Sequence, residues 1–317
     1  MPSGIASPMG YGEGAHLLSV FEWRKGDVLK RIKDEQLLDL ARDQTVVLGR
    51  IRRHVESKLS APDERPRGIH PSELSRDDFC PKATFFAMSG LTPTKVEKHS
   101  QRLLSIFAEG STIHDKWQGW AWSMGDLVGM FGCLLCKKNA TGGPWWGTAP
   151  QICPTCGAGR EYLKYLEIPV NDAATGIVGH ADIRVGSALG ELKSVAPGSV
   201  RIENERLYIR HTHEVEGRSL LDLDGMWRDL KRPFPSHIKQ LQIYLHCTGL
   251  DTGFVLYEWK VNQAAKEFSV PYHQKTIAQE LDICADIQYA LKRDIPPLCP
   301  HDVSGCPKCN AYEEKAA

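Results

Sequence analysis

Two closely spaced cysteine pairs constrain the middle of this chain more than any other feature of the sequence. They are Cys133 with Cys136, in CLLC, and Cys153 with Cys156, in CPTC. Four thiolates with these spacings suit one tetrahedral Zn²⁺ ion. The residues between the pairs, KKNATGGPWWGTAPQI, suit a ribbon hairpin. We therefore expect residues 131–160 to form a small inserted zinc ribbon.

Two tryptophans, Trp145 and Trp146, stand in the hairpin between the cysteine pairs. Indole rings can stack on the bases of nucleic acids. They can equally well cover the small hydrophobic core of such a module. The sequence leaves both interpretations open for these residues.

The cysteine usage and the first residues indicate the compartment. The start, MPSGIASPMGYGEGAHLLSV, has no basic segment followed by an apolar run, so a secretory signal is not expected. No apolar run approaches the ~20 residues that cross a bilayer, so we expect no membrane partner. Ten cysteines in a cytoplasmic chain favour metal sites over disulfides. Cys247 and Cys284 lie among apolar residues at helical spacing and are expected in the core.

The order of the predicted elements favours a mixed α/β fold with a small central sheet flanked by helices. Residues 1–79 read as an N-terminal helical region and connector, with helical spacing of apolar residues between about 18 and 59. Strands are expected in YLKYLEIPV, GIVGHADIRV and GELKSV, before a polar, irregular segment at 196–235 that we expect to be a long loop with some structure of its own. A helix in SHIKQLQIYLHCTG, a strand in TGFVLYEWKV and a helix in TIAQELDICADIQYALKRD follow.

An acidic hairpin lies in GHADIRVGSALGELKSV. Turn residues between Gly186 and Gly190 place Asp182 and Glu191 on neighbouring strands, and Glu191 shares a face with Lys193. Two carboxylates aimed at one point repel each other unless a cation lies between them, and Mg²⁺ or Mn²⁺ prefers such oxygen ligands. With a lysine beside them, they suit metal-assisted hydrolysis of a phosphodiester. A surface hairpin with a salt bridge is the alternative.

The acidic hairpin resembles the core of the PD-(D/E)XK nuclease superfamily, with Asp182 followed by Glu191-x-Lys193. This resemblance implies a restriction-endonuclease-like core, which we expect in residues 80–130 and 161–317. The zinc ribbon at 131–160 would then interrupt the core.

Two further motifs resemble the RecB-like and CRISPR-associated exonuclease branch of that superfamily. Gly110 and His114, in EGSTIHDKW, match its G-x-x-x-H motif, and Gln240 and Tyr244, in KQLQIY, match its Q-x-x-x-Y motif. Residues four apart on a helix share one face. Glu167 also matches an acid that is frequent in the family. Each motif alone is weakly specific, whereas the whole set in family order is strongly specific.

The resemblance implies the role of each of these residues. The metal ligands would be His114, Asp182, Glu191 and the carbonyl of Leu192, and an imidazole among oxygen ligands favours Mn²⁺ over Mg²⁺. Lys193 would position the nucleophile and offset negative charge. Gln240 and Tyr244 would orient the lysine and the DNA.

Four more cysteines resemble the iron–sulfur staple of RecB-like nucleases. Cys80 precedes the core, and Cys299, Cys306 and Cys309 follow it, which implies a 4Fe–4S cluster that ties the two ends together. The tail departs from the common order, because its wide gap precedes the C-x-x-C pair. Thiolates also bind Zn²⁺, so zinc is the alternative occupant.

The resemblance implies a Mn²⁺- or Mg²⁺-dependent exonuclease acting on DNA, with a free single-stranded end as substrate. Recombination, repair, phage DNA processing and CRISPR adaptation are the processes it would serve, in the cytoplasm of a bacterial, archaeal or virus-infected cell. A helicase, a recombinase or a CRISPR-adaptation protein would be its partner. The formal net charge is zero, so the DNA site must be local.

Two alternatives stay open at the level of the sequence. One is a non-catalytic DNA-binding or docking subunit of a nuclease–helicase complex. The other is a DNA endonuclease. The chain has no GxxxxGK[ST] motif, so it is not expected to be a helicase itself.

Overall fold

The computed structural model describes residues 47–58, 66–93, 100–140, 142–301 and 305–313 of the 317. The chain divides into two units, Met1–Ile51 and Arg52–Ala317. Of the helices expected between about 18 and 59, helix α2 (Leu48–Lys58) is described, and residues 18–46 lie outside the described part. Among the described helices, none combines the length and apolar character needed to cross a bilayer.

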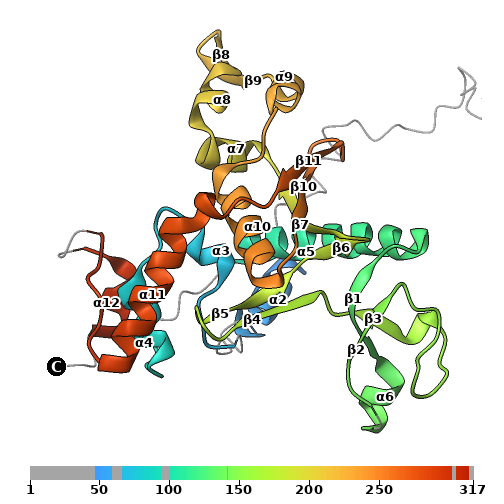
Figure 1. Ribbon diagram of the computed structural model, residues 1–317. Coiled ribbons are helices and arrows are strands. Elements are labelled where there is room, and N and C mark those ends of the chain that lie inside the picture. The colour runs from blue at the N-terminus through green and yellow to red at the C-terminus, as the bar shows by residue number, and fades with distance from the viewer. Residues whose placement is uncertain (1–46, 59–65, 94–99, 141, 302–304, 314–317) are drawn as a thin grey trace, which may run out of the picture. The chain divides into compact units, whose positions relative to one another are not determined.

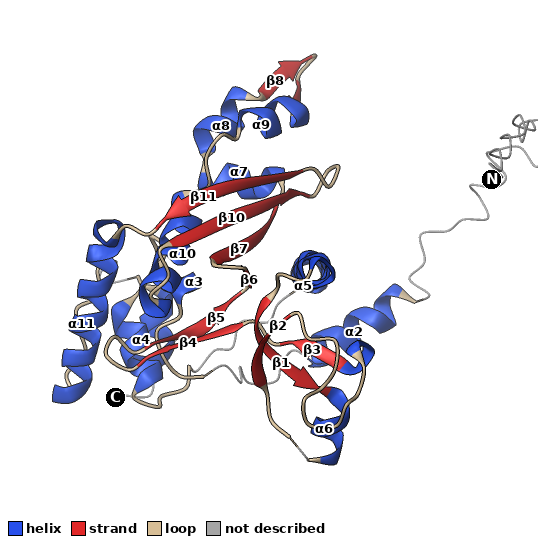
Figure 2. Ribbon diagram, turned by 45° about the vertical axis from the view of Figure 1, so that its right-hand side comes forward, coloured by secondary structure: helices blue, strands red, loops and turns tan. Residues whose placement is uncertain are grey.

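A four-stranded mixed sheet forms the centre of the second unit (Figures 1 and 2). Its strand order is β11 (Ala265–Pro271), β10 (Thr252–Trp259), β7 (Ala188–Val195), β6 (Ile183–Val185). Strands β7 and β10 are parallel, and the two outer pairs are antiparallel. Strand β7 is buried along most of its length, as expected for a strand with parallel pairing in the middle of a sheet. The predicted mixed α/β architecture with a small sheet is confirmed.

Two long helices pack on this sheet, and a third follows it in the chain. Helix α5 (Gln101–Met124) contacts β7, and helix α10 (Pro235–Thr248) contacts β7 and β10. Ser100 caps the first turn of α5, and Gly125 ends it in a left-handed conformation. Helix α11 (Ala278–Arg293) follows the short 3₁₀ turn η2 (Gln274–Ile277).

A separate hairpin leads into the acidic segment. Strand β4 (Ile168–Asp172) pairs antiparallel with β5 (Ile177–Ala181), and Asp182 separates β5 from β6. Helix α10 contacts β4, and the short helix α3 (Pro71–Leu74) contacts both β5 and α10.

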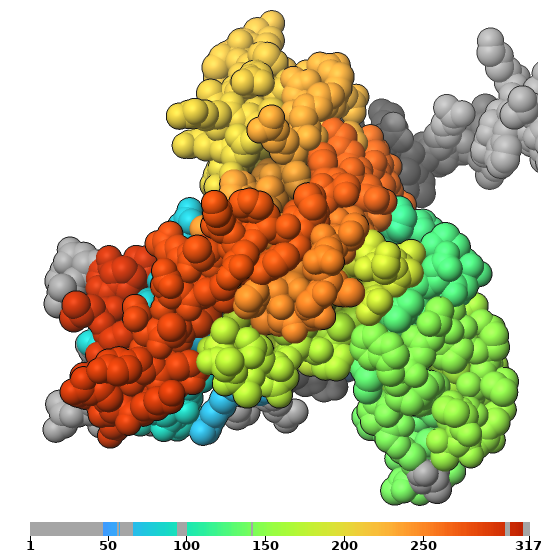
Figure 3. Space-filling model, viewed as in Figure 1, coloured from blue at the N-terminus to red at the C-terminus, as the bar shows by residue number. Residues whose placement is uncertain are grey.

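The cysteine-rich insert forms a three-stranded antiparallel sheet (green in Figures 1 and 3). Its order is β2 (Trp145–Thr148), β1 (Val128–Cys133), β3 (Leu163–Tyr165), with helix α6 (Leu134–Asn139) and the 3₁₀ turn η1 (Arg160–Tyr162) in the connections. We expect the insert at residues 131–160 from the cysteine spacing. The sheet extends beyond this range at both ends, from Val128 to Tyr165. We call residues 127–166 the cysteine module.

The segment 196–235, expected to be a long loop with some structure of its own, consists largely of short regular elements. It contains α7 (Pro197–Glu203), α8 (Glu205–Arg210), the hairpin β8 (Thr212–Val215) and β9 (Arg218–Leu221), and α9 (Leu223–Asp229). These elements are too short, and their exposed faces too polar, for periodicity to reveal them.

The C-terminal tail returns to the beginning of the core. Helix α12 (Pro307–Glu313) contacts helix α4 (Pro81–Met88), which also contacts α11. The Lys308 ammonium donates to the carbonyl oxygen of Asp78 (2.6 Å), and the His301 ring donates to the carbonyl oxygen of Phe79 (2.8 Å). The tail is thereby fixed beside Cys80.

Candidate metal-dependent active site

Asp182 and Glu191 approach each other through the pairing of β6 and β7. Ile183 lies opposite Gly190, so Asp182 lies next to Glu191 at the edge of the hairpin. Any side chain at Gly190 would overlap the Phe254 ring, because a Cβ there would lie 2.3 Å from Cζ of Phe254. The amide of Leu192 donates to Oδ2 of Asp182 (2.8 Å) and fixes its carboxylate.

Glu191 is a fully buried carboxylate with one free oxygen. Its Oε1 accepts from the Lys193 ammonium, whereas its Oε2 has no hydrogen-bond partner among the described residues. Burial and the charge of Asp182 raise the pKa of Glu191 to about 7. A buried oxygen without a donor is costly unless a cation fills its place.

Lys193 forms an ion pair with Glu191, two residues earlier on the same strand. Burial alone would lower the pKa of its ammonium, but the charges of Glu191 and Asp182 more than offset this and raise it. Lys193 is therefore a permanently charged group beside the two acids.

His114 faces this pair of acids from helix α5. Its Nδ1 lies 3.7 Å from Oδ1 of Asp182. One turn later, the side-chain amide of Gln118 donates to the backbone carbonyl oxygen of Asp182 (2.8 Å), so α5 also holds the backbone of Asp182. Burial and the positive charge of Lys193 lower the pKa of His114, which favours the neutral, metal-binding form of the ring.

Glu167 is a third acid at this point. One ligand atom each from His114, Glu167 and Asp182 all lie within 4.8 Å of one another. Glu167 has a left-handed backbone (φ 63°), and its carbonyl oxygen accepts from the amide of Met130 in β1 (3.1 Å). Burial raises its pKa, as does the charge of Glu191. The sequence identifies Glu167 only as an acid that is frequent in the family. The turn between β3 and β4 brings it close to His114 and Asp182 and so makes it a candidate metal ligand.

These side chains fit a hard divalent cation. Burial raises the pKa of Asp182 to about 6, and together with Glu167 and Glu191 it forms an acidic group that is poorly solvated without a cation. Carboxylate oxygens and one imidazole are ligands that Mn²⁺ and Mg²⁺ accept. The orphaned Oε2 of Glu191 is the observation that most directly calls for an ion.

Gln240 and Tyr244 lie on the buried face of α10, as their spacing predicts. Burial raises the pKa of Tyr244, as do the charges of Glu191 and Asp182, and a hydrogen bond with Gln240 opposes the rise. Gln240 lines the same hollow as Lys193. Leu192 contributes its amide to Asp182, while its side chain is buried in the core.

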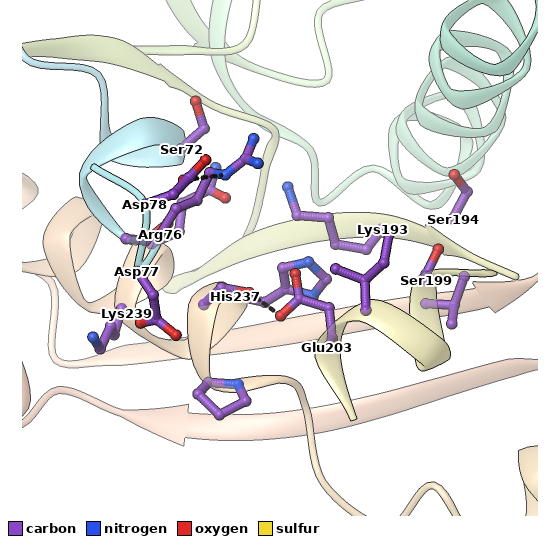
Figure 4. A pocket seen from close by; sticks show the side chains of 16 residues that line it. Ser72, Arg76, Asp77, Asp78, Lys193, Ser194, Ser199, Glu203, His237 and Lys239 are labelled. Atoms are coloured by element: carbon purple, nitrogen blue, oxygen red, sulfur yellow. Dashed lines mark hydrogen bonds and ion pairs between the residues drawn. The ribbon is translucent and has the colours of Figure 1, made fainter. Parts of the chain in front are cut away.

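A hollow of about 700 Å³ opens beside Lys193. Figure 4 shows Lys193 and His237 facing it, with Glu203 on one side and Arg76 on the other. His237 is a lining residue that sequence reasoning missed. Its only sequence signal is its position three residues before Gln240, on the same face of α10.

The first cysteine tetrad lies in the cysteine module. One sulfur atom from each of Cys133, Cys136, Cys153 and Cys156 falls within 4.8 Å of the others, with the pairs 133–156 and 136–153 both at 3.7 Å. A Zn–S length of about 2.3 Å places tetrahedral sulfurs about 3.8 Å apart. Burial would raise the pKa of Cys153, but hydrogen bonds from the amides of Cys156 and Thr155 lower it to about 6, which favours the thiolate.

The second tetrad closes the tail onto the core. The sulfurs of Cys80, Cys299, Cys306 and Cys309 also lie within 4.8 Å of one another, with Cys80 and Cys299 at 3.7 Å. Hydrogen bonds from the amides of Cys309 and Lys308 outweigh burial and lower the pKa of Cys306 to about 7. Both tetrads therefore contain a C-P-x-C turn whose first sulfur accepts amide hydrogens.

The two remaining cysteines lie outside the tetrads, as the sequence predicts. Cys284 is fully buried and Cys247 is partly buried against the main core.

No protein-family model and no curated protein matches this chain. Among solved structures, the alkaline exonuclease LHK-Exo from Laribacter hongkongensis aligns over 40% of this chain and 57% of its own, with 16% identity and a TM-score of 0.28. LHK-Exo in complex with dAMP aligns over 72% of this chain and 89% of its own (12% identity, TM-score 0.38). The structure of SSO0001 aligns over 77% and 89%, respectively (13% identity, TM-score 0.34). The chain thus spans little more than half of the first of these structures.

Proposed function

We propose that this protein is a metal-dependent deoxyribonuclease that hydrolyses phosphodiester bonds from a free, single-stranded DNA end. The observation that carries the proposal is the convergence of His114, Glu167 and Asp182, with the buried Glu191 and its partner, the Lys193 ammonium, on the neighbouring strand β7. These residues come from α5, the β3–β4 turn and the β6–β7 hairpin. A salt bridge on a surface hairpin would not require a fully buried Glu191.

The residues around the site would have two different roles, metal binding and charge compensation. His114, Glu167, Asp182 and Glu191 would hold one or two divalent ions, with the carbonyl of Leu192 as a further ligand. Such an ion polarises a phosphate and makes a bound water nucleophilic at neutral pH. Lys193 remains charged beside the acids, where its ammonium orients the water and offsets charge that develops on the phosphate.

Gln240 and Tyr244 form the supporting layer behind the lysine. Both are buried on α10, and Gln240 reaches the hollow that Lys193 lines. We assign to them the orientation of Lys193 and of a phosphate oxygen. Their burial makes this geometry rigid, which a positioning role requires.

Exonuclease action on single strands is the part of the proposal that the family resemblance supplies. Recombination, repair, phage DNA processing or CRISPR adaptation would employ it, with a helicase, a recombinase or a CRISPR-adaptation protein as partner.

Both cysteine tetrads are proposed as structural metal sites. In the cysteine module the sulfur spacing supports one Zn²⁺ ion. In the tail the resemblance implies a 4Fe–4S cluster, in which each thiolate binds a different iron and the sulfurs lie further apart. The observed spacing, with all four sulfurs within 4.8 Å, favours a single tetrahedral ion there as well.

The test is the release of nucleotides from end-labelled single-stranded DNA with and without Mn²⁺. We expect metal-dependent release by the wild type and a loss of at least about 100-fold in Lys193→Ala. Lys260→Ala is the matched control, because Lys260 pairs with Glu109 at 2.9 Å and does not line the hollow.

Three outcomes would contradict parts of the proposal. Equal behaviour of wild type and Lys193→Ala would reject the catalytic assignment. Tight DNA binding without any release would instead favour a binding or docking subunit. Cleavage of covalently closed circles would show an endonuclease.

A further inference from the structure

One face of the three-stranded sheet in the cysteine module is open. Along β1 and β2 the side chains alternate, so that Phe131 and Trp145 pack inward while Met130 and Trp146 point to the other face. Trp146 is 50% exposed, whereas Trp145 is packed against the core. The two adjacent tryptophans thus have different surroundings, and only Trp146 offers its ring to a ligand.

The register of the strands sets the shape of this open face. Trp146 lies opposite Met130 across β2 and β1, and Gly132 lies opposite Lys164 across β1 and β3. Leu166 leans over Gly132, because a Cβ at Gly132 would lie 3.1 Å from Cδ1 of Leu166. The face therefore runs from an exposed indole on β2, over partly buried apolar side chains, to an exposed lysine on β3 (strands β2, β1 and β3 in Figure 2).

The charge of the cysteine module differs from that of the whole chain. Residues 127–166 contain four basic side chains and one acidic side chain, Glu161, whereas the chain as a whole is neutral. The basic residues are Lys137, Lys138, Arg160 and Lys164. Both lysines of α6 and Lys164 are exposed, while three of the four cysteines are buried. The accessible surface of the module is therefore suited to a polyanion.

The open face ends beside the candidate metal site. The amide of Leu166 donates to the carbonyl oxygen of Met130 (2.8 Å), and the amide of Met130 donates to that of Glu167 (3.1 Å). Glu167 is one of the three residues whose ligand atoms converge. From β2, which carries Trp146, to β3, which ends two residues before Glu167, is two strand spacings, or about 10 Å.

We propose that the open face of the cysteine module, formed by Trp146, Met130, Leu166 and Lys164, binds the unpaired bases of a single-stranded DNA segment that adjoins the cleaved phosphate. An exposed indole provides a stacking platform for any base, and the lysine binds a phosphate. The excess of basic residues favours a nucleic acid over a second copy of this neutral chain. This inference rests on the proposed nuclease function and extends it to the substrate.

The experiment measures the affinity of Lys193→Ala protein for a fluorescein-labelled thymidine oligonucleotide with Ca²⁺, so that binding is separated from cleavage. Adding Trp146→Ala should weaken binding about 5- to 100-fold, the effect of losing one stacked base. Adding Lys164→Gln should lower the slope of log affinity against log salt by about 0.7. Tyr289→Ala, at a 60% exposed aromatic on α11, is the control and should leave the affinity unchanged.

The zinc content and the Tm of Trp146→Ala are compared with those of its parent, so that misfolding is recognised. Unchanged affinity in a correctly folded Trp146→Ala protein would overturn the inference, even if the wild type is a nuclease. Equal loss of duplex and single-strand binding, or a change in oligomeric state, would overturn it too. If the wild type cleaves nothing but binds single strands through Trp146, the binding surface stands and the proposed function fails.

Discussion

His237 is buried at the end of a chain of hydrogen bonds that begins in the backbone. The amide of Phe234 donates to the Tyr257 hydroxyl (2.7 Å), and this hydroxyl is also hydrogen-bonded to Nδ1 of His237 (2.7 Å). Burial and the charge of Lys193 lower the pKa of His237 well below its usual 6.5.

This pKa predicts a loss of stability in mild acid. As the pH falls through about 6.5, His237 binds a proton in the unfolded chain but stays unprotonated in the folded protein, because its pKa is lower there. The contribution amounts to at most about 1.4 kcal/mol for each pH unit. The Tm of wild type should therefore fall more steeply between pH 7 and pH 5 than that of His237→Gln.

The exposed His213 on β8 provides the control for this measurement. His213→Gln should follow the wild-type curve. Parallel curves for wild type and His237→Gln would show that the ring is not kept neutral.

At the scale of elements, Gly110 governs the packing of α5 on β7. A Cβ at this position would lie 3.9 Å from Oγ of Ser194, which is an ordinary contact. The glycine therefore leaves room for a methyl group, and a branched side chain would extend further toward Ser194. Since Gly110 lies one turn before His114, a larger side chain would displace the imidazole from Asp182.

Two substitutions of Gly110 should consequently differ. Gly110→Ala should keep the nuclease activity and raise the stability by up to about 1 kcal/mol, because alanine is the better helix former. Gly110→Ile should lower the activity at least about 10-fold by shifting α5. Thermal unfolding and nucleotide release measure both effects, and an inactive Gly110→Ala would refute this view of the packing.

The cysteine module and the candidate active site share the turn at Glu167. The amide of Met130 holds the carbonyl of Glu167, and Gly129 (φ 155°) packs against Tyr165 and that same carbonyl. The Tyr165 hydroxyl donates to the carbonyl of Val128 (3.1 Å). The module therefore keeps Glu167 in its left-handed conformation.

Loss of metal from the module should then weaken the active site. Cys136→Ser, at a buried ligand, should lower the affinity for Mn²⁺ about 10-fold, as loss of a supporting contact does at other metal sites. Cys247→Ser, outside both tetrads, is the matched control. Calorimetric titration with Mn²⁺ gives both values, and equal affinities would show that the module and the site are independent.

The parts of the site that lie close together in sequence were predictable, and the rest was not. The turn at 186–190 and the spacing of Gln240 and Tyr244 each fix which side chains share a face, and the structure brings these groups together. The turn at Glu167 and the contact of His237 with Tyr257 depend on strands distant in sequence. Strand β11 was missed because its burial alternates at the sheet edge and its sequence, AKEFSVP, is short and polar.

At the scale of the whole molecule, the tail tetrad joins residues that are 219 positions apart, Cys80 and Cys299. Cys80 also caps helix α4, since its sulfur accepts from the amide of Ala83 (3.4 Å). A metal here closes a long loop, so its binding energy stabilises the complete core.

Metal analysis and thermal unfolding test this closure. The spacing of the sulfurs predicts about two zinc ions for each chain, a colourless protein, and a Tm that falls by about 5–10 °C in Cys309→Ser. A brown protein with about four irons and one zinc would contradict the single-ion geometry and support the cluster that the resemblance implies. An unchanged Tm in Cys309→Ser would show that the tail carries no structural metal.

The central claim is that residues far apart in the chain share a divalent cation. Titration with Mn²⁺ of protein that retains the metal of its cysteine tetrads, followed by electron paramagnetic resonance, tests it directly. We predict one or two bound ions in the wild type, unchanged binding in the Glu267→Gln control, at an exposed acid on the edge strand β11, and at least about 10-fold weaker binding in Asp182→Asn and in Glu191→Gln. Wild-type affinity in both of these variants would contradict the account.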